Sequence, residues 1–487
     1  MSSQHVDEET PLLQPEQPVK RTPMPWRQFS IILFLQLAEP LTSQVISPFA
    51  PQLIRDIGIT GGDETKVGYY VGVMHSLFFA TQALTVLHWS RASDHIGRKP
   101  VILTGLFGLS LSMYCFGLSR TFWGLVFSRA LNGALNGNIG VIKSMMVEIT
   151  DSTNLAQAYA YMPIAWSSGG TLGPLIGGAL SRPADRFPNV FGNSEFFKTY
   201  PYFLACAVPA TFSALAWLVT FLFLKETVTS RFTIGRLLRG KLSEDSACKS
   251  PATLEESTDS LSTQETVLKE NERPLPLRSL LIPRVIIAAG NYGTLSLLDI
   301  AFRAVQPLFF ATPMELGGLG LDPPRIGNIL AVYGIINGLF QIFFFADLHD
   351  YYGTKKIYTV AMASAFPLIM TFPILNALGR SQGLGWMVWS VVGIQLVISV
   401  ILNLGYACVF IYIAAASPNR ASLGATNGIA QMVVSIMRSL GPASVNSLFS
   451  FSIENPHHAW VVYYFMLLLA FIATIASAQL PRQLWTN

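Results

Sequence analysis

The chain has little charge. Charged residues make up only 12% of its 487 residues, whereas soluble domains carry about 25%. Hydrophobic residues reach 51% and the mean hydropathy is +0.44. A surface this poor in charge excludes a cytosolic enzyme, a nucleic-acid-binding protein and a disordered scaffold. What remains is an all-α membrane protein, because outer-membrane barrels alternate apolar and polar residues and lack the long apolar runs seen here.

Cysteine and histidine are also scarce, with four cysteines and seven histidines. No cysteine pair has the spacing of a disulfide framework or a metal site, so we expect the cysteines to be buried as small apolar groups. The sequence lacks a phosphate-binding glycine loop followed by Lys-Ser/Thr and any recognisable nucleophile or cofactor motif. We therefore expect no enzyme, no ATP-driven step, no resident cofactor and no resident metal.

Apolar runs long enough to cross a bilayer recur along the chain in two sets of six. They fall near 28–49, 67–89, 101–119, 121–145, 156–180 and 201–224, and then near 284–312, 326–346, 357–378, 385–416, 421–449 and 459–479. We expect five parts: a disordered tail (1–26), a six-helix half (27–224), a polar linker (225–283), a second six-helix half (284–480) and a short tail (481–487).

Lysine and arginine in the short loops set the orientation. Arg91, Arg98 and Lys99 follow span 2, and Lys355 and Lys356 follow span 8. By the positive-inside rule both termini, and both tails, are cytoplasmic. The N-terminal tail also carries a short stretch that resembles an acidic-dileucine sorting signal for a vacuole-type membrane, in which an adaptor would bind Glu8, Leu12 and Leu13. The alternative is a plain disordered tail.

Two pairs of motifs repeat at corresponding positions in the halves. After span 2 the chain has Asp94, then Gly97, Arg98 and Lys99; after span 8 it has Asp350, then Gly353 and Lys355. Span 5 contains Leu-Gly173-Pro174, and span 11 contains Leu-Gly441-Pro442. Matching helix-interrupting residues in two halves indicate a transporter built from repeats.

With these motifs the chain resembles the major facilitator superfamily. The Asp94 to Lys99 stretch resembles the superfamily's loop 2–3 signature, and Arg129 to Gly133 in span 4 resembles its second motif. The span 5 stretch resembles the motif of the drug:proton antiporter branch. The sequence of these motifs is similar to that of fungal relatives of the zinc-induced-facilitator-like transporters. The resemblance implies twelve transmembrane helices in two six-helix pseudo-repeats, working as a monomer. Two positions depart from the signature: Ser90 stands for a glycine and His95 for a basic residue.

The resemblance also implies roles for two of the motifs. The first is a conformational latch that favours one access state, with the alternative of a simple positive-inside anchor; its residues are Asp94, Gly97, Arg98, Lys99, Asp350, Gly353 and Lys355. The second is a tight helix contact in span 5, with the overlapping alternative of plain small-residue packing; its residues are Gly169, Gly173, Pro174, Gly177 and Gly178.

Ionisable residues inside spans are costly and usually functional. Counted along continuous helices at 1.5 Å per residue, Glu39, His75 and Arg129 share one depth near the middle of the bilayer. Polar residues at helical spacing in several spans predict a polar cavity at that depth, because an amide facing lipid has no partner. The expected cavity residues are Gln36, Glu39, Ser43, His75, Arg129, Asn132, Asn136, Asp299, Arg303, Asn337, Gln341, Gln431 and Arg438.

Glu39 is the candidate proton carrier, because burial and a nearby guanidinium act in opposite directions on a carboxyl group. The alternative is a permanent structural pair between Glu39 and Arg129. Asp299 and Arg303 are four residues apart and can pair on one helix turn, either structurally or in coupling. His75 is either functional or a packing residue.

Lys143, near the end of span 4, is expected to extend its ammonium group towards the membrane surface, with Glu148 beside it. The alternative is an inward-facing side chain, because Lys143 continues the polar stripe that Arg129, Asn132 and Asn136 form in span 4.

These features predict a secondary active transporter that exports a small solute in exchange for protons, in a vacuolar or plasma membrane. Proton-coupled symport and a non-transporting sensor that signals through the linker are the alternatives. The expected partners are a small-molecule substrate, protons and the lipid bilayer, with no nucleic acid. Drugs, organic acids, amino acids, polyamines and metal chelates all fit the expected cavity.

Overall fold

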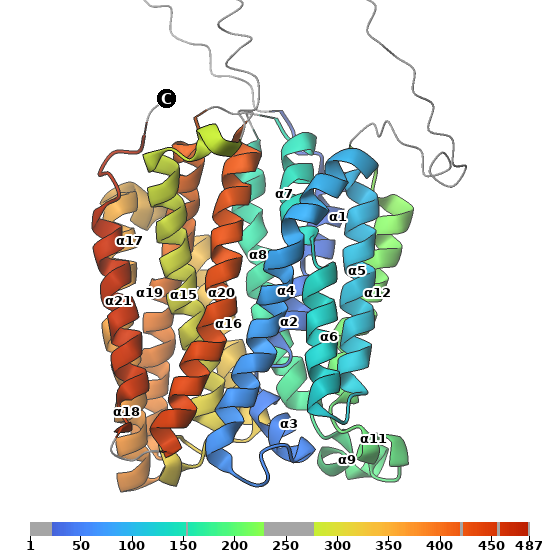
Figure 1. Cartoon of the computed structure of the whole chain (residues 1–487), viewed down its shortest axis with the longest axis vertical. Helices are drawn as coiled ribbons and strands as arrows, with labels where there is room; N and C mark the ends of the chain where they lie inside the picture. The colour runs from blue at the N-terminus through green and yellow to red at the C-terminus, as the bar shows by residue number, and fades with distance from the viewer. Residues whose placement is uncertain (1–21, 152–153, 228–276, 419–421, 455–457, 486–487) are drawn as a thin grey trace, which may run out of the picture.

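The structure is a computed structural model that describes residues 22–151, 154–227, 277–418, 422–454 and 458–485. The predicted sorting signal at Glu8, Leu12 and Leu13, and most of the predicted linker, lie outside these ranges. The described chain is a bundle of upright helices without strands. In Figure 1 the C-terminus lies at the upper end, here called the terminal end, while α3, α9 and α11 lie at the lower, far end.

The first half contains six membrane-length segments within the described ranges. They are α1–α2 (Trp26–Gln36, Ala38–Gln44), α4 (Val67–Ile96), α5 (Arg98–Gly117), α6–α7 (Phe122–Leu135, Asn138–Ile149), α8 (Leu155–Leu180) and α12 (Phe203–Phe223). Short helices cover the far end: α3 (Ala50–Ile57), η1 (Glu64–Lys66), α9 (Pro183–Arg186), α10 (Pro188–Phe191) and α11 (Glu195–Thr199).

The second half supplies six further segments. They are α15 (Pro283–Ala311), α16 (Pro323–Tyr352), α17–α18 (Thr354–Ala363, Ala365–Gln382), α19 (Trp386–Ala416), α20 (Leu423–Glu454) and α21 (Val461–Ala478), with η2 (Leu277–Leu280) and η3 (Met314–Leu316) outside them. Seven of the twelve segments are individually long and apolar enough to cross a membrane within the described residues. Helices dominate because a chain in lipid must satisfy its backbone hydrogen bonds internally.

The described helices follow the apolar runs closely but extend further at the terminal end. α4 continues to Ile96 and α16 to Tyr352, so the backbones of Asp94 and Asp350 lie in last helical turns and not in loops. The turn after each helix is made by a single glycine. Gly97 has φ 106° and Gly353 has φ 75°, a conformation that costs glycine little and other residues much.

Three spans are interrupted where the sequence suggests continuous helices, and one of them is span 9 of the second half, which is divided at Ser364. Span 1 is divided at Leu37, and span 4 is divided between Leu135 and Asn138. At the break in span 4 Asn136 has ψ 76°, and the Gly137 N–H donates to the Leu135 carbonyl at 3.1 Å. That is the geometry of an inverse γ-turn. The interruptions of spans 1 and 4 lie in the first half and shape the site described below.

The repeat between the halves extends to a pair of lysines. Lys99 Nζ donates to the Phe221 carbonyl at 2.8 Å, near the end of α12. Lys355 Nζ donates to the Ala478 carbonyl at 3.0 Å, at the end of α21. Each lysine therefore caps the carboxyl end of the last span in its own half, where a cation is favoured by the helix dipole.

Close contacts between the halves lie towards the far end. A Cβ on Gly178 of α8 would lie 2.7 Å from the Pro323 carbonyl oxygen of α16, and one on Gly327 of α16 would lie 2.4 Å from the Pro174 carbonyl oxygen. On the other side of the bundle, the Ala443 N–H of α20 donates to Ser76 Oγ of α4 at 2.7 Å. The absence of side chains at these glycines lets the two backbones touch, which closes the halves against each other there.

Candidate functional site

The break in span 4 creates a polar environment in the middle of the first half. Trp89 Nε1 of α4 donates to the Ala134 carbonyl at 2.8 Å, which satisfies one backbone group freed by the break. Asn136 is fully buried, and neither of its amide atoms has a hydrogen-bond partner in the described protein. Irregular backbone at membrane depth is tolerated only where it is enclosed by protein or lines a cavity, and the buried Asn136 shows that this break is enclosed by protein.

Glu39 lies beside this break, in the first turn of α2, where the helix dipole favours a negative charge. The amides of Asn136 and Gln82 and the cations Arg438 and Lys143 interact electrostatically with its carboxyl group. In the described residues, no cationic side chain lies within salt-bridge distance of the Glu39 carboxylate. Glu39 and Lys143 belong to the first half and Arg438 to the second, so these charges meet across the boundary between the halves.

Arg129 is not the partner of Glu39. Its guanidinium lies over the Phe78 ring, 4.9 Å from the ring centroid, and its Nε and Nη1 atoms have no hydrogen-bond partner in the described protein. Its charge acts on His75, which is partly buried in α4. A cation beside His75 opposes metal binding there, and the described residues contain no cluster of three histidine, cysteine or acidic side chains.

Lys143 differs from its expected position. Its ammonium group lies 5.6 Å from the centroid of the Phe410 ring, which belongs to α19 in the other half, so the side chain points into the bundle. Glu148 instead forms an ion pair with Arg98, with 3.0 Å between Oε1 and Nη2. The sequence analysis favoured the membrane surface for Lys143, because a depth count along a continuous helix ignores the change that the break at Asn136 makes to α7.

The second half holds a connected polar network. Arg303 Nε bonds both carboxylate oxygens of Asp299, at 2.9 and 3.0 Å. The Nη2 atom of Arg303 donates to the Tyr333 hydroxyl at 3.0 Å and to Asn403 Oδ1 at 3.1 Å. The structure thus contains the pair that the spacing of four predicts, and it adds two partners from other spans.

Tyr406 connects that network to the boundary between the halves. Its hydroxyl donates to Asp299 Oδ2 at 2.9 Å and accepts from Arg438 Nη2 at 3.5 Å. A chain of interacting groups therefore runs from Arg303 through Asp299, Tyr406 and Arg438 to Glu39. Neither Tyr406 nor Asn403 was predicted from the sequence, because an uncharged residue in a long apolar span gives little signal.

A cavity of about 30 Å³ lies next to this network, between the two halves. The first half contributes Gln44, Ser47, Gly170 and Pro174, and the second contributes Asp299, Phe302, Arg303, Gln306, Leu330, Tyr333, Ser399 and Asn403. Of the other expected cavity residues, Asn132, Asn337 and Gln431 are buried, as is Gln36 at the end of α1. Ser43 and Gln341 are partly exposed. None of these six takes part in the hydrogen bonds described above.

The span 5 glycines divide into two contacts. Cβ atoms on Gly169, Gly173 and Gly177 would lie 2.6, 2.9 and 1.9 Å from atoms of span 1, so this face packs against the helix that carries Glu39. Gly178 packs against α16 of the other half. Span 5 is thereby in close contact with both halves of the molecule at adjacent positions.

At the terminal end the motif residues are linked by an acid that the sequence does not single out. Glu226 accepts from the backbone N–H groups of Arg98 and Lys99, at 2.8 and 3.0 Å, and so caps α5. The side chain of Asp94, a member of the expected latch, lies outside the described residues. Asp350 is exposed beside His349, with 3.5 Å between Oδ1 and Nδ1. The signal for Glu226 was its position directly after span 6.

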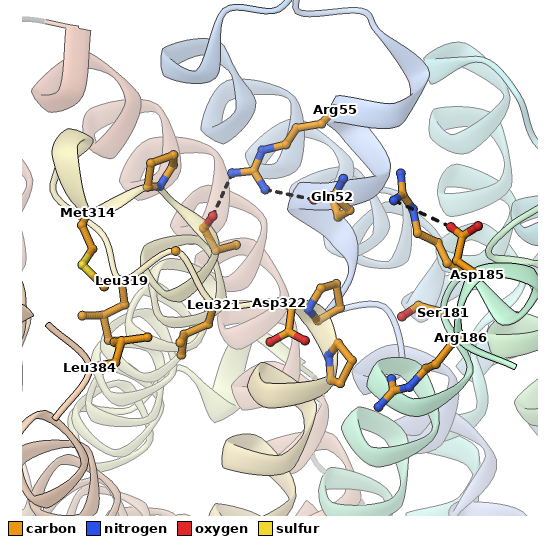
Figure 2. Close-up of a pocket in the computed structure, with 16 residues that line it drawn as sticks. Gln52, Arg55, Ser181, Asp185, Arg186, Met314, Leu319, Leu321, Asp322 and Leu384 are labelled. Atoms are coloured by element: carbon orange, nitrogen blue, oxygen red, sulfur yellow. Dashed lines mark hydrogen bonds and ion pairs between the residues drawn. The ribbon is translucent and has the colours of Figure 1, made fainter. Parts of the chain in front are cut away.

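A vestibule of about 820 Å³ opens between the halves at the far end (Figure 2). Arg55 is one of the residues that line this vestibule. Its Nε atom pairs with Glu64 at 2.8 Å, and its Nη2 atom donates to the Ala311 carbonyl of the other half at 2.9 Å. Near the same end, hydrogen bonds from Thr65 lower the pKa of Asp63. The hydrogen bond from Arg55 to the Ala311 carbonyl joins the two halves at the far end, in addition to the glycine contacts.

Comparison with known proteins identifies the family. The family model described as Major Facilitator Superfamily matches residues 32–442. The chain belongs to the major facilitator superfamily. The major facilitator-type transporter psiT2 of Psilocybe cyanescens is 30% identical over 91% of this chain and 88% of its own length. Protein ZINC INDUCED FACILITATOR 1 of Arabidopsis thaliana is 30% identical over 88% of this chain and 85% of its own length.

A multidrug transporter of Aspergillus fumigatus, mfsB, is 28% identical over 90% of this chain and 81% of its own length. Among solved structures, a D-xylose-proton symporter has a TM-score of 0.64 at 13% identity, covering 94% of this chain and 98% of the other. The human organic anion transporter MFSD10 has a TM-score of 0.63 at 17% identity, covering 94% of this chain and 100% of the other. The chain is thus a multi-pass membrane transporter of the major facilitator fold, not an enzyme, and one fold serves differently charged solutes.

Proposed function

We propose that this chain is a proton-coupled secondary transporter that moves a small solute by alternating access, with Glu39 as the proton carrier. The observation that carries the proposal is that the Glu39 carboxyl interacts electrostatically with cations of both halves, Lys143 and Arg438. When the halves rock, the distance from Glu39 to Arg438 changes while Lys143 stays in the same half. The electrostatic cost of protonating Glu39 then differs between the two access states, which is what coupling requires.

The direction of coupling depends on the charge of the solute. A cationic solute competes with the proton for Glu39 and is exchanged for it, which is the export by antiport that the span 5 motif implies. An anionic solute competes with the Glu39 carboxylate for the cations and binds best when Glu39 is protonated, so the two move together. The two cations facing one carboxyl favour this second candidate, symport.

We further propose that the terminal end is cytoplasmic, in a vacuolar or plasma membrane, and that the chain acts as a monomer. Lys99 and Lys355 lie at that end, each capping the last span of its half, in agreement with the positive-inside rule. A protease-accessible tag on the C-terminus of the protein in sealed membranes tests the orientation. We expect the tag to be cleaved only when the protease has access to the cytoplasmic side. Cleavage by protease confined to the opposite side contradicts the proposed orientation.

Growth tests on a null strain and an overexpressing strain examine the function. The panel contains drugs, weak acids, amino-acid analogues and zinc, and each strain is compared with Glu39→Gln and with the control Glu195→Gln, an exposed acid on α11. We expect a change in tolerance that rises with expression and is lost only in Glu39→Gln. Tolerance that survives in Glu39→Gln contradicts the role of Glu39.

Reconstituted protein then gives the direction of coupling. A pH-sensitive dye inside proteoliposomes follows proton movement while the solute identified by the panel flows down its gradient. Protons moving against the solute indicate antiport, and protons moving with it indicate symport. Solute flux without proton movement refutes the proposal.

A further inference from the structure

The charges at the boundary between the halves are unbalanced, and this imbalance points to the class of solute. Lys143 has no carboxylate within salt-bridge distance in the described residues and lies against the Phe410 ring. Arg438 likewise has no such carboxylate there and reaches the neutral Tyr406 hydroxyl at 3.5 Å. Within the described residues, the Glu39 carboxyl interacts electrostatically with both cations, and the Asp299 carboxylate interacts with Arg438.

The other acid of the site is already neutralised. Asp299 bonds Arg303 through both oxygens and accepts from the Tyr406 hydroxyl, so its charge is matched by a guanidinium on the same helix turn. The connected groups comprise three cations, Lys143, Arg438 and Arg303, and two acids, Glu39 and Asp299. The site holds one positive charge in excess when Glu39 is ionised and two when it is protonated.

A cluster of three aromatic rings lies beside the unmatched cations: Phe410 is next to Lys143, and Tyr406 is next to Arg438. The ring centroids of Tyr292 and Phe410 are 5.3 Å apart, those of Tyr292 and Tyr406 are 6.1 Å apart, and those of Tyr406 and Phe410 are 6.3 Å apart. All three rings belong to the second half, whereas Lys143 belongs to the first. A solute held here would place a charged group against the cations and an apolar or aromatic body against the rings.

We propose that the solute is an organic anion, a carboxylate with an aromatic body, held by Lys143 and Arg438. An uncompensated positive charge within a membrane is costly, and a bound carboxylate removes that cost. The inference rests on the Glu39 proton site of the proposed function and selects symport from its two coupling modes. The anion and the Glu39 carboxylate compete for the same cations, so protonation of Glu39 strengthens anion binding. The neutral groups facing Glu39 are Gln82 and Asn136, which carry no charge that would oppose this effect.

Binding to the purified full chain, without any pH gradient, tests the inference. The probes are matched sets built on the same rings: benzoate, benzamide and benzylamine, with the corresponding naphthalene compounds, and chloride as the inorganic control. Thermal stabilisation by each probe gives its Kd. We expect the carboxylates to bind tighter than their amides and amines, and tighter at lower pH. Amides, amines or chloride that bind as well as every carboxylate overturn the inference, as does a carboxylate set that does not stabilise the protein.

Variants link the binding to the named residues. Lys143→Gln should weaken carboxylate binding by about ten- to a hundredfold, the effect of losing one charged hydrogen bond. Lys143→Arg should retain binding, which shows that a folded site remains, and Lys198→Gln on the surface of α11 serves as the control. Glu39→Gln should bind carboxylates tightly at every pH. Carboxylate binding that is unchanged in Lys143→Gln overturns the assignment.

The outcomes for the two proposals are separate. Because no gradient is applied, anion binding is measured whether or not transport is proton-coupled. Anion binding that keeps its pH dependence in Glu39→Gln refutes Glu39 as the proton carrier while leaving the solute class intact. Preferential binding of amines refutes the solute class while leaving Glu39 as the proton site, with antiport as its mode.

Discussion

Adding one methyl group to Gly178 should open the far end of the molecule. A Cβ at this position would lie 2.7 Å from the Pro323 carbonyl oxygen and 3.1 Å from Gly327 Cα, both in the other half. The obstructing atoms are backbone, so α8 and α16 must separate. Overpacking of this kind costs about 1–3 kcal/mol. Because the contact exists only while the far end is closed, Gly178→Ala should shift the closed-to-open ratio by about 5- to 150-fold.

The assay measures access from the far side. Ser47 lines the small cavity between the halves, and a cysteine introduced there, with the four native cysteines replaced, reports exposure to a membrane-impermeant maleimide. Gly178→Ala should raise the labelling rate from the far side. Gly393→Ala is the control, because that exposed glycine of α19 has no atom within 4 Å of an added Cβ.

Gly177, the residue before Gly178, provides a second comparison for the labelling assay. A Cβ on Gly177 would lie 1.9 Å from the Val45 carbonyl oxygen, within the same half. That contact is present in both access states, so Gly177→Ala should lower thermal stability and leave the labelling rate unchanged. The reasoning is refuted if Gly178→Ala labels no faster than Gly393→Ala, or if Gly177→Ala labels as fast as Gly178→Ala.

Three further changes test other contacts. Glu226→Gln removes the charged cap of α5 and should lower stability by about 0.5–2 kcal/mol in thermal denaturation; an unchanged melting temperature contradicts the capping role. Arg55→Gln removes the charged bond to the Ala311 carbonyl, worth about 1.5–3 kcal/mol, and should raise far-side labelling of the cavity cysteine as Gly178→Ala does. Asp299→Asn leaves Arg303 without its acid and should destabilise the protein by about 3 kcal/mol, with partial recovery when Arg303→Gln is added; a stable single variant shows that the pair is not structural.

The fold was predictable because lipid imposes one strong rule. A chain within a membrane must bond its own backbone, so long apolar runs become helices, and the polar segment between two sets of runs separates two halves. Helix ends were less predictable. The run after residue 67 was expected to end near 89, yet α4 continues to Ile96, because hydropathy falls at the membrane surface while backbone hydrogen bonding continues until Gly97 adopts a positive φ.

The site was predictable in composition but not in its pairings. Residue counting gave Glu39 and Arg129 one depth, but depth is a single coordinate, and contact also requires the two side chains to point towards each other. Arg129 turns towards Phe78 within its own half. Lys143 was assigned to the membrane surface because the ψ of 76° at Asn136, far from the helical value of about −42°, has no signature in hydropathy. Asp299 and Arg303 were paired correctly because i,i+4 contacts are local.

The proposed interaction between Glu39 and Arg438 has a consequence for how this transporter works. Glu39 and Lys143 are fixed in one half, so their mutual attraction is the same in every access state. Arg438 and the aromatic rings belong to the other half, and they approach Glu39 only when the halves come together around it. In the proposed mechanism, the electrostatic interaction between Glu39 and Arg438 therefore depends at once on the proton, on a bound anion and on the access state. A single interaction with these three dependences is sufficient for coupling, because any two linked equilibria change each other's free energy by the same amount.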